Sequence, residues 1–243
     1  MKQGNNIKQL IKKNKPSIVS VAFAIPTLTP TEDGKQNIEI KFAGSGFFIS
    51  KDGYLCTCNH VLQGGQGQLM IGVKKNGDYE FIPAKIILTD QERDIAIVQI
   101  PKIDPNKDIK LSIVDIGDSD PIEEGDEVIF IGFPFGGQTG GGFTPSSTHG
   151  IISALRPRKI GDADIPFFQI DALTLEGNSG APVFDSDGRV IGIINARFDP
   201  LMIGNTPQVI IGGRPLGIST NIGFAIPINL IKPLINAVLE KIK

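Results

Sequence analysis

Hydrophobic residues in this chain fall into short runs of strand length that end at glycine, proline, asparagine or aspartate. Valine, isoleucine and phenylalanine dominate these runs, which is typical of β-strands. A first set of runs covers 17–25, 38–49, 69–73, 81–88 and 95–100, and a second covers 127–133, 150–155, 167–170, 181–184, 189–196 and 222–226. Two successive sets of short strands predict an all-β protein built from two antiparallel β-barrels.

The segment 101–110 is polar, contains two prolines and lacks an apolar period, so it is the natural connector between the barrels. Helical spacing is clear only near the end, where Asn229 is a candidate N-cap and Pro233 fits a first turn. The apolar positions there are Ile231, Leu234, Ile235, Val238, Leu239 and Ile242. We therefore predict an N-terminal segment with helical character (1–16), a first barrel (17–106), a second barrel (107–228) and a C-terminal helix (229–243).

The composition indicates a globular protein, with 40% hydrophobic and 21% charged residues. A net charge of −2 creates no field that would attract nucleic acid, and we expect no nucleic-acid partner. No apolar run is long enough for a membrane span, and the Lys-rich start lacks the apolar core of a signal peptide. The expectation for this chain is a cytoplasmic protein, or an exported one if a signal sequence preceded it. Its lysines at 8, 12, 13 and 15 suit a solvated helix face better than a partner or membrane contact.

Two cysteines, Cys56 and Cys58, lie two positions apart in a strand-like run and so point to one face. A disulfide between them would be badly strained, and reduced thiols in the core are the simpler interpretation. A Cys-x-Cys pair can contribute to a metal site, but the chain has no further cysteine to complete one. We predict neither a metal nor another cofactor.

The segment 177–182, GNSGAP, places Ser179 between small residues in a turn. In such a turn a serine hydroxyl is exposed, and the backbone N–H groups of Gly177 and Ser179 can converge on one point. That arrangement is an oxyanion hole, the feature that stabilises the intermediate of acyl transfer.

A serine nucleophile also needs a base and a group that orients the base. His60 ends a strand-like segment, and Asp94 begins the apolar run DIAIVQI between that histidine and Ser179. Asp90 and Glu92 are the local alternatives to Asp94. The order His, Asp, Ser is the order used in chymotrypsin-like enzymes. His60, Asp94 and Ser179 are therefore the predicted catalytic triad of a serine endopeptidase.

The chain resembles the protease domain of HtrA/Deg-type serine proteases across nearly its whole length. The matching blocks, in order, are GSGFFISKDGYLCTCNHV, DIAIVQI, IGDSDPIEEGDEVIFIGFPFG, THGIISAL, DALTLEGNSGAPVFDSDGRVIGIINA and IGFAIPINLIKPLI. The resemblance implies a chymotrypsin-like double barrel, the same triad, the same oxyanion donors, unfolded or flexible protein substrates and a trimeric homo-oligomer.

The departures from the family pattern lie beside the nucleophile. Ala181 stands where the family often has glycine, and Leu175 and Glu176 stand where it often has Asn-Pro. Most relatives continue after the C-terminal helix into peptide-binding PDZ domains, so regulation by such a domain is not carried over to this chain.

In the chymotrypsin fold, the residue six positions before the nucleophile forms the floor of the primary specificity pocket. Here that residue is Leu173, and we expect the walls to come from Ile194, Asn195 and Ala196 and from the strand that contains Phe224. An aliphatic pocket predicts a broad preference for small or medium aliphatic P1 side chains.

Two other functions remain as alternatives. A protease fold that has lost catalysis would act as a binding module, although the predicted site residues are intact. An esterase of the α/β-hydrolase class would need alternating strands and long helices with its histidine last, which this sequence lacks. The second histidine, His149, is interpreted as a structural or surface residue.

Overall fold

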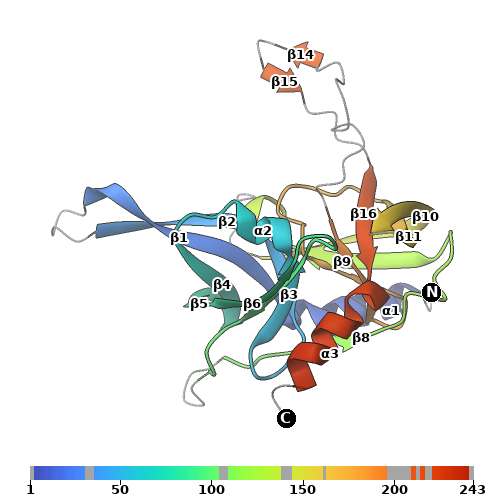
Figure 1. Ribbon diagram of the computed structural model, residues 1–243, viewed down its shortest axis with the longest axis horizontal. Coiled ribbons are helices and arrows are strands. Elements are labelled where there is room, and N and C mark those ends of the chain that lie inside the picture. Colours follow the sequence, from blue (N-terminus) through green and yellow to red (C-terminus); the bar gives the residue numbers. More distant parts are fainter. Residues whose placement is uncertain are drawn as a thin grey trace.

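The computed structural model describes residues 3–30, 36–103, 109–137, 144–160, 163–195, 209–211, 214–216 and 221–240. Most of these residues belong to two seven-stranded sheets, and the few helices lie mainly near the two ends of the chain (Figure 1). This mostly β architecture with two barrel-like sheets confirms the predicted fold class.

The first sheet has the strand order β5-β4-β1-β2-β3-β7-β6. Its interior is filled by large apolar side chains, among them Phe47, Phe48 and Leu55, which are fully buried. The hairpin of β1 and β2 reaches out beyond the body of the molecule (Figure 1). The strands are β1 (Ile18–Pro30), β2 (Gln36–Phe48), β3 (Tyr54–Cys58), β4 (Gln68–Lys75), β5 (Asp78–Pro83), β6 (Lys85–Asp90) and β7 (Ile95–Gln99). The short helix α2 (Asn59–Gln63) follows β3 directly.

The second sheet has the order β12-β9-β10-β11-β16-β13-β8. Because β12 also pairs with β13, the strands from β9 to β16 close into a ring, and β8 adds a parallel edge to β13. The strands are β8 (Asp115–Ile116), β9 (Glu127–Gly132), β10 (Ser146–Ile160), β11 (Ala163–Asp171), β12 (Pro182–Phe184), β13 (Arg189–Ile194) and β16 (Ile222–Pro227). The 3₁₀ turn η2 (Pro134–Gly137) follows β9, and β14 (Val209–Ile211) pairs with β15 (Arg214–Leu216).

The N-terminal helix α1 (Gln3–Asn14) leads through η1 (Lys15–Ser17) into β1 and is tied to the second sheet. Lys13 Nζ lies 2.7 Å from an Asp115 carboxylate oxygen, and the Asn14 amide donates to the carbonyl of Gly188. At the other end, η4 (Ile228–Leu230) precedes α3 (Lys232–Glu240), which buries Ile235 and Val238. None of the helices within these described ranges is long and apolar enough to cross a membrane.

Two details differ from the sequence-based expectations. The single run predicted at 81–88 is two strands, β5 and β6, which separate at Pro83, since proline cannot donate to the ladder. Asn229 does not cap α3. Its amide instead donates to Asp118 at 2.6 Å, and its backbone N–H donates to the Ser119 hydroxyl, so it anchors the approach to the helix.

Candidate active site

His60 and Asp94 lie side by side at one end of the first sheet. His60 is in the first turn of α2, and its Nδ1 lies 2.6 Å from Asp94 Oδ2. The backbone N–H of His60 also donates to Asp94 Oδ1 at 2.8 Å. An ionised carboxylate only accepts hydrogen bonds, so this contact places the proton on Nδ1 and leaves Nε2 as the basic nitrogen.

The backbone around Asp94 brings its carboxylate to the histidine. Asp94 has φ of 57°, a left-handed conformation that aspartate tolerates better than most residues, and it is nearly buried. Its carbonyl accepts the N–H of Asn59, the first residue of α2. The turn before β7 is thus tied to the start of the helix. Residues with an uncommon backbone conformation, such as that of Asp94, occur more often at functional sites than elsewhere.

Asn195 supplies a third donor to the same carboxylate. Its Nδ2 donates to Asp94 Oδ2 at 2.8 Å, and the residue is fully buried. We expected Asn195 to form a wall of the substrate pocket. Its side chain instead supports Asp94, so only its backbone is available to line a pocket. The sequence offered no signal for this contact, because the two residues lie on different barrels.

Ser179 is in the loop between β11 and β12, where each carbonyl from Glu176 to Ser179 accepts a hydrogen bond. The Glu176 carbonyl accepts from Phe135 N–H at 2.7 Å, and the Asn178 carbonyl accepts from Ala181 N–H at 2.9 Å. The Gly177 carbonyl accepts from the Ser45 hydroxyl at 2.7 Å, and the Ser179 carbonyl from Ser45 N–H at 2.8 Å. Gly177 has φ of 93°, which only glycine adopts readily. The turn is therefore closely defined.

Close packing at Gly44 links the serine turn to the histidine helix. A Cβ atom added to Gly44 would lie 2.7 Å from a methyl of Val61 and 2.9 Å from the carbonyl oxygen of Ser179. Val61 directly follows His60, so the two predicted catalytic side chains come from neighbouring backbone segments. The structure thus brings His60, Asp94 and Ser179 to one region between the two sheets.

Cys58 lies beneath the same site. One potential ligand atom each from Cys58, His60 and Asp94 lies within 4.8 Å of the others, a spacing that could suggest a metal ion. Each atom already has another role, however. The Cys58 thiol donates to the Ile194 carbonyl at 3.3 Å, and burial, with the nearby Asp94 charge, raises its pKa. Metals bind the thiolate, so this group fits a core thiol better than a ligand. Cys56 is likewise buried, and both cysteines are free.

The described residues include four of the five predicted pocket residues. Leu173 follows β11 and is 37% exposed, Ile194 ends β13 with its side chain in the core, and Asn195 N–H donates to the Phe224 carbonyl at 2.8 Å. Ala196 lies outside the described residues. Sequence reasoning did not single out Thr174, whose methyl would be 2.4 Å from a Cβ at Gly223, so this glycine makes room for Thr174.

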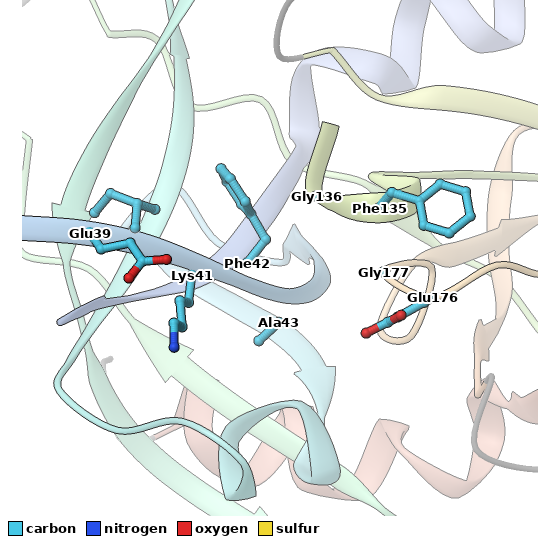
Figure 2. Close-up of a pocket in the computed structure, with 9 residues that line it drawn as sticks. Glu39, Lys41, Phe42, Ala43, Phe135, Gly136, Glu176 and Gly177 are labelled. Atoms are coloured by element: carbon cyan, nitrogen blue, oxygen red, sulfur yellow. The ribbon is translucent and has the colours of Figure 1, made fainter. Parts of the chain in front are cut away.

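A cavity of about 350 Å³ lies beside the serine turn. Figure 2 shows its lining from β2, from η2 and from the turn itself. None of the predicted pocket residues within the described part of the chain lines it. The lining residues are Glu39, Ile40, Lys41, Phe42, Ala43, Phe135, Gly136, Glu176 and Gly177.

Comparison with known proteins agrees with this arrangement of the site. Residues 44–193 match the family described as the trypsin-like peptidase domain. The chain belongs to this family. It is also similar to HtrA/DegP-type proteins, the resemblance that the sequence predicted.

Two curated relatives show the extent of the similarity. A probable periplasmic serine endoprotease, DegP-like, from Bartonella henselae is 39% identical over 199 residues, which are 82% of this chain and 33% of the relative. A protein of the same description from Marinomonas sp. is 41% identical over 150 residues, 62% of this chain and 29% of the relative. This trypsin-like chain spans about a third of the length of the curated relatives it matches.

Solved structures also resemble this chain. The HtrA-type protease AlgW with a decapeptide superposes with a TM-score of 0.71 at 26% identity, covering 96% of this chain and 67% of AlgW. Deg5 superposes with a TM-score of 0.67 at 24% identity, covering 96% of this chain and 93% of Deg5, which supports the fold.

The second histidine of this peptidase-family chain lies away from the site. His149 is in β10, its side chain is 47% exposed, and its Nε2 is 3.8 Å from a carboxylate oxygen of Glu127. These features agree with its interpretation as a surface residue.

Proposed function

We propose that this chain is a serine endopeptidase in which Ser179 is the nucleophile, His60 the general base and Asp94 the group that orients the base. The observation that carries the proposal is the Asp94 carboxylate, which accepts from the His60 ring, the His60 backbone and Asn195. This arrangement holds the imidazole in the tautomer that a serine protease requires. Asp90, the alternative in the sequence, pairs with Arg93 instead.

In the proposed reaction, Ser179 Oγ attacks the carbonyl carbon of the scissile peptide bond and His60 Nε2 takes the hydroxyl proton. The backbone N–H groups of Gly177 and Ser179 stabilise the resulting oxyanion. His60 then protonates the leaving amine, and the acyl group remains on Ser179. Water, deprotonated by His60, attacks the acyl-enzyme, and Ser179 recovers its proton as the carboxylic acid product leaves.

We propose that the substrates are unfolded or flexible protein segments. The solved structure described as an HtrA-type protease with decapeptide supports a peptide as ligand. Leu173, Ala196 and Phe224, with the backbone of Ile194 and Asn195, would form the P1 pocket. No charged residue is in this set, which favours an aliphatic P1 side chain.

The compartment and assembly are also proposals. The curated relatives are described as periplasmic, which favours the exported alternative over the cytoplasmic one. A homotrimer remains the expected assembly by resemblance to the family.

The test is Ser179→Ala, assayed on an unstructured protein substrate. We expect turnover to fall about a millionfold, the loss measured for the nucleophile of subtilisin, with the fold intact. A fluorophosphonate probe should label Ser179 in the wild-type protein and fail to label the variant. If the wild type neither reacts with the probe nor cleaves the substrate, the binding-module alternative is favoured and the proposal is wrong.

A further inference from the structure

Ser45 connects the two sheets at the serine turn. It lies in β2 of the first sheet and is fully buried. Its N–H donates to the Ser179 carbonyl at 2.8 Å and its hydroxyl donates to the Gly177 carbonyl at 2.7 Å. The same hydroxyl accepts the N–H of Phe133, at the end of β9, at 2.8 Å. One small side chain therefore joins β2, the serine turn and the segment that leads into η2.

These contacts bear on the predicted oxyanion donors. In a trans peptide the C=O and N–H bonds point in opposite directions, so fixing one fixes the other. The peptide between Gly177 and Asn178 is held at both ends, by the Ser45 hydroxyl on its carbonyl and by the Leu175 carbonyl on its N–H at 3.0 Å. This peptide lies between the two peptides whose N–H groups belong to Gly177 and Ser179. Its orientation therefore sets the angle between the two donors.

The surroundings leave little room for the turn to move without breaking these contacts. A Cβ on Gly177 would be 2.3 Å from the Phe133 carbonyl oxygen, and a Cβ on Gly132 would be 2.9 Å from Ser45 Oγ. Phe135, which holds the Glu176 carbonyl, has φ of 52°, an uncommon value for an aromatic residue. A bulky residue keeps such a conformation only when its neighbours determine it. Figure 2 shows Phe135 and Gly136 next to Glu176 and Gly177, with Glu39 and Lys41 of β2 on the opposite side of the view.

We propose that the Ser45 hydroxyl is a positioning group for the oxyanion hole, an inference that rests on the proposed peptidase function. Ser45 does not touch the substrate. Its hydroxyl bridges the Gly177 carbonyl and the N–H of Phe133. This bridge keeps the N–H groups of Gly177 and Ser179 pointing at one position, where the oxyanion forms. Removal of the hydroxyl takes away the hydrogen bonds that it makes to the Gly177 carbonyl and to the Phe133 N–H, and with them this restraint on the orientation of the turn.

The chain contains a matched control for this test. Ser20 in β1 is the cross-strand partner of Ser45 and is equally buried. Its hydroxyl has no hydrogen-bond partner among the residues that the structure describes. Ser20→Ala therefore removes the same atom from the neighbouring position and leaves no group unpaired.

We would compare Ser45→Ala, Ser45→Cys and Ser20→Ala by steady-state kinetics and by amide hydrogen exchange. Loss of one oxyanion donor costs about 10²- to 10³-fold in kcat, so a donor that is only misaimed should cost about 10- to 100-fold. We expect this loss for Ser45→Ala with KM unchanged, a smaller loss for Ser45→Cys because a thiol is a weak donor, and none for Ser20→Ala. The Phe133 amide should exchange faster only in the Ser45 variants.

Equal kcat values for Ser45→Ala and Ser20→Ala, whether both normal or both reduced, would overturn the proposal. If Ser45→Ala did not fold, the same comparison of Ser45→Cys with Ser20→Ala would decide. If the wild-type protein had no peptidase activity, the proposed function would fail by itself. In that case an unchanged rate of amide exchange at Phe133 in Ser45→Ala would separately show that the Ser45 hydroxyl does not restrain the turn.

Discussion

Replacement of Asp94 by asparagine tests the centre of the proposed mechanism. The carboxylate receives three donors, from the His60 backbone at 2.8 Å, His60 Nδ1 at 2.6 Å and Asn195 Nδ2 at 2.8 Å. An amide has one oxygen, so its NH₂ group must face at least one of these donors. If the NH₂ faces the His60 backbone N–H, these two donors are both left without an acceptor. Each such donor lowers the free energy of unfolding by about 1–3 kcal/mol. If it faces the ring, the ring proton moves to Nε2 and the base is lost.

The second orientation is favoured, because the Asn195 amide can turn its own oxygen toward the new donor. We expect kcat to fall about 10⁴-fold, the effect of the equivalent substitution in a Ser-His-Asp protease. The assay is kcat on an unstructured protein substrate, together with the ¹⁵N shifts of the His60 ring, which report the tautomer. Urea unfolding should show a loss of about 1–3 kcal/mol.

The matched control is Asp90→Asn, in the same turn. Asp90 accepts from the Arg93 backbone at 2.8 Å and lies 2.6 Å from its guanidinium, so its loss should affect the turn and leave kcat unchanged. A decrease of less than about tenfold for Asp94→Asn, equivalent to about 1.4 kcal/mol in the barrier, would refute the assigned role. So would a normal Nδ1–H tautomer in an inactive variant, since the loss would then have another cause.

Four further predictions follow from particular residues. A peptide library should show cleavage after Val, Leu, Ile or Ala, and a profile dominated by Lys or Arg would mean that Leu173 is not the pocket floor. Gly132→Ala should lower the free energy of unfolding by about 1–3 kcal/mol and reduce kcat, because a Cβ there would lie 2.9 Å from Ser45 Oγ and 3.0 Å from Asn178 Oδ1; normal kcat and stability would contradict the packing. Burial raises the pKa of Tyr79 to about 12, so the folded state keeps a proton that the unfolded state releases near pH 10. Stability should therefore fall as the pH rises between these values, and Tyr79→Phe should reduce that slope in urea unfolding; an unchanged slope would argue against it. Finally, Asn178 is a neutral amide that cannot pair with a freed α-ammonium, so acetylation of the N-terminal amine should leave kcat unchanged. Activity that appears only after a defined cleavage, and disappears on acetylation of the new amine, would contradict this prediction.

Much of the fold was predictable from local sequence. The runs at 38–49, 95–100 and 127–133 became β2, β7 and β9, because β-branched and aromatic residues between turn signals specify strands locally. The strand pair β14 and β15 was not predicted. Neither were the separation of β5 from β6 nor the two-residue β8, which exists as a strand only through its pairing with β13.

The sequence by itself was enough to predict the chemistry that we propose for the site. His60, Asp94 and the GNSG turn were recognisable because their residue types, order and neighbours follow a known pattern. Only the tertiary structure showed which groups support them. Asn195 was assigned to the pocket from its position in the chain, yet it binds Asp94 from the other barrel at 2.8 Å. Ser45 was an unremarked serine between two glycines, and its role in the turn depends on β2, β9 and the loop before β12 meeting at one point. Hydrogen bonds between residues about 100 positions apart leave no periodic trace in the sequence, because their geometry depends on how the two barrels pack together.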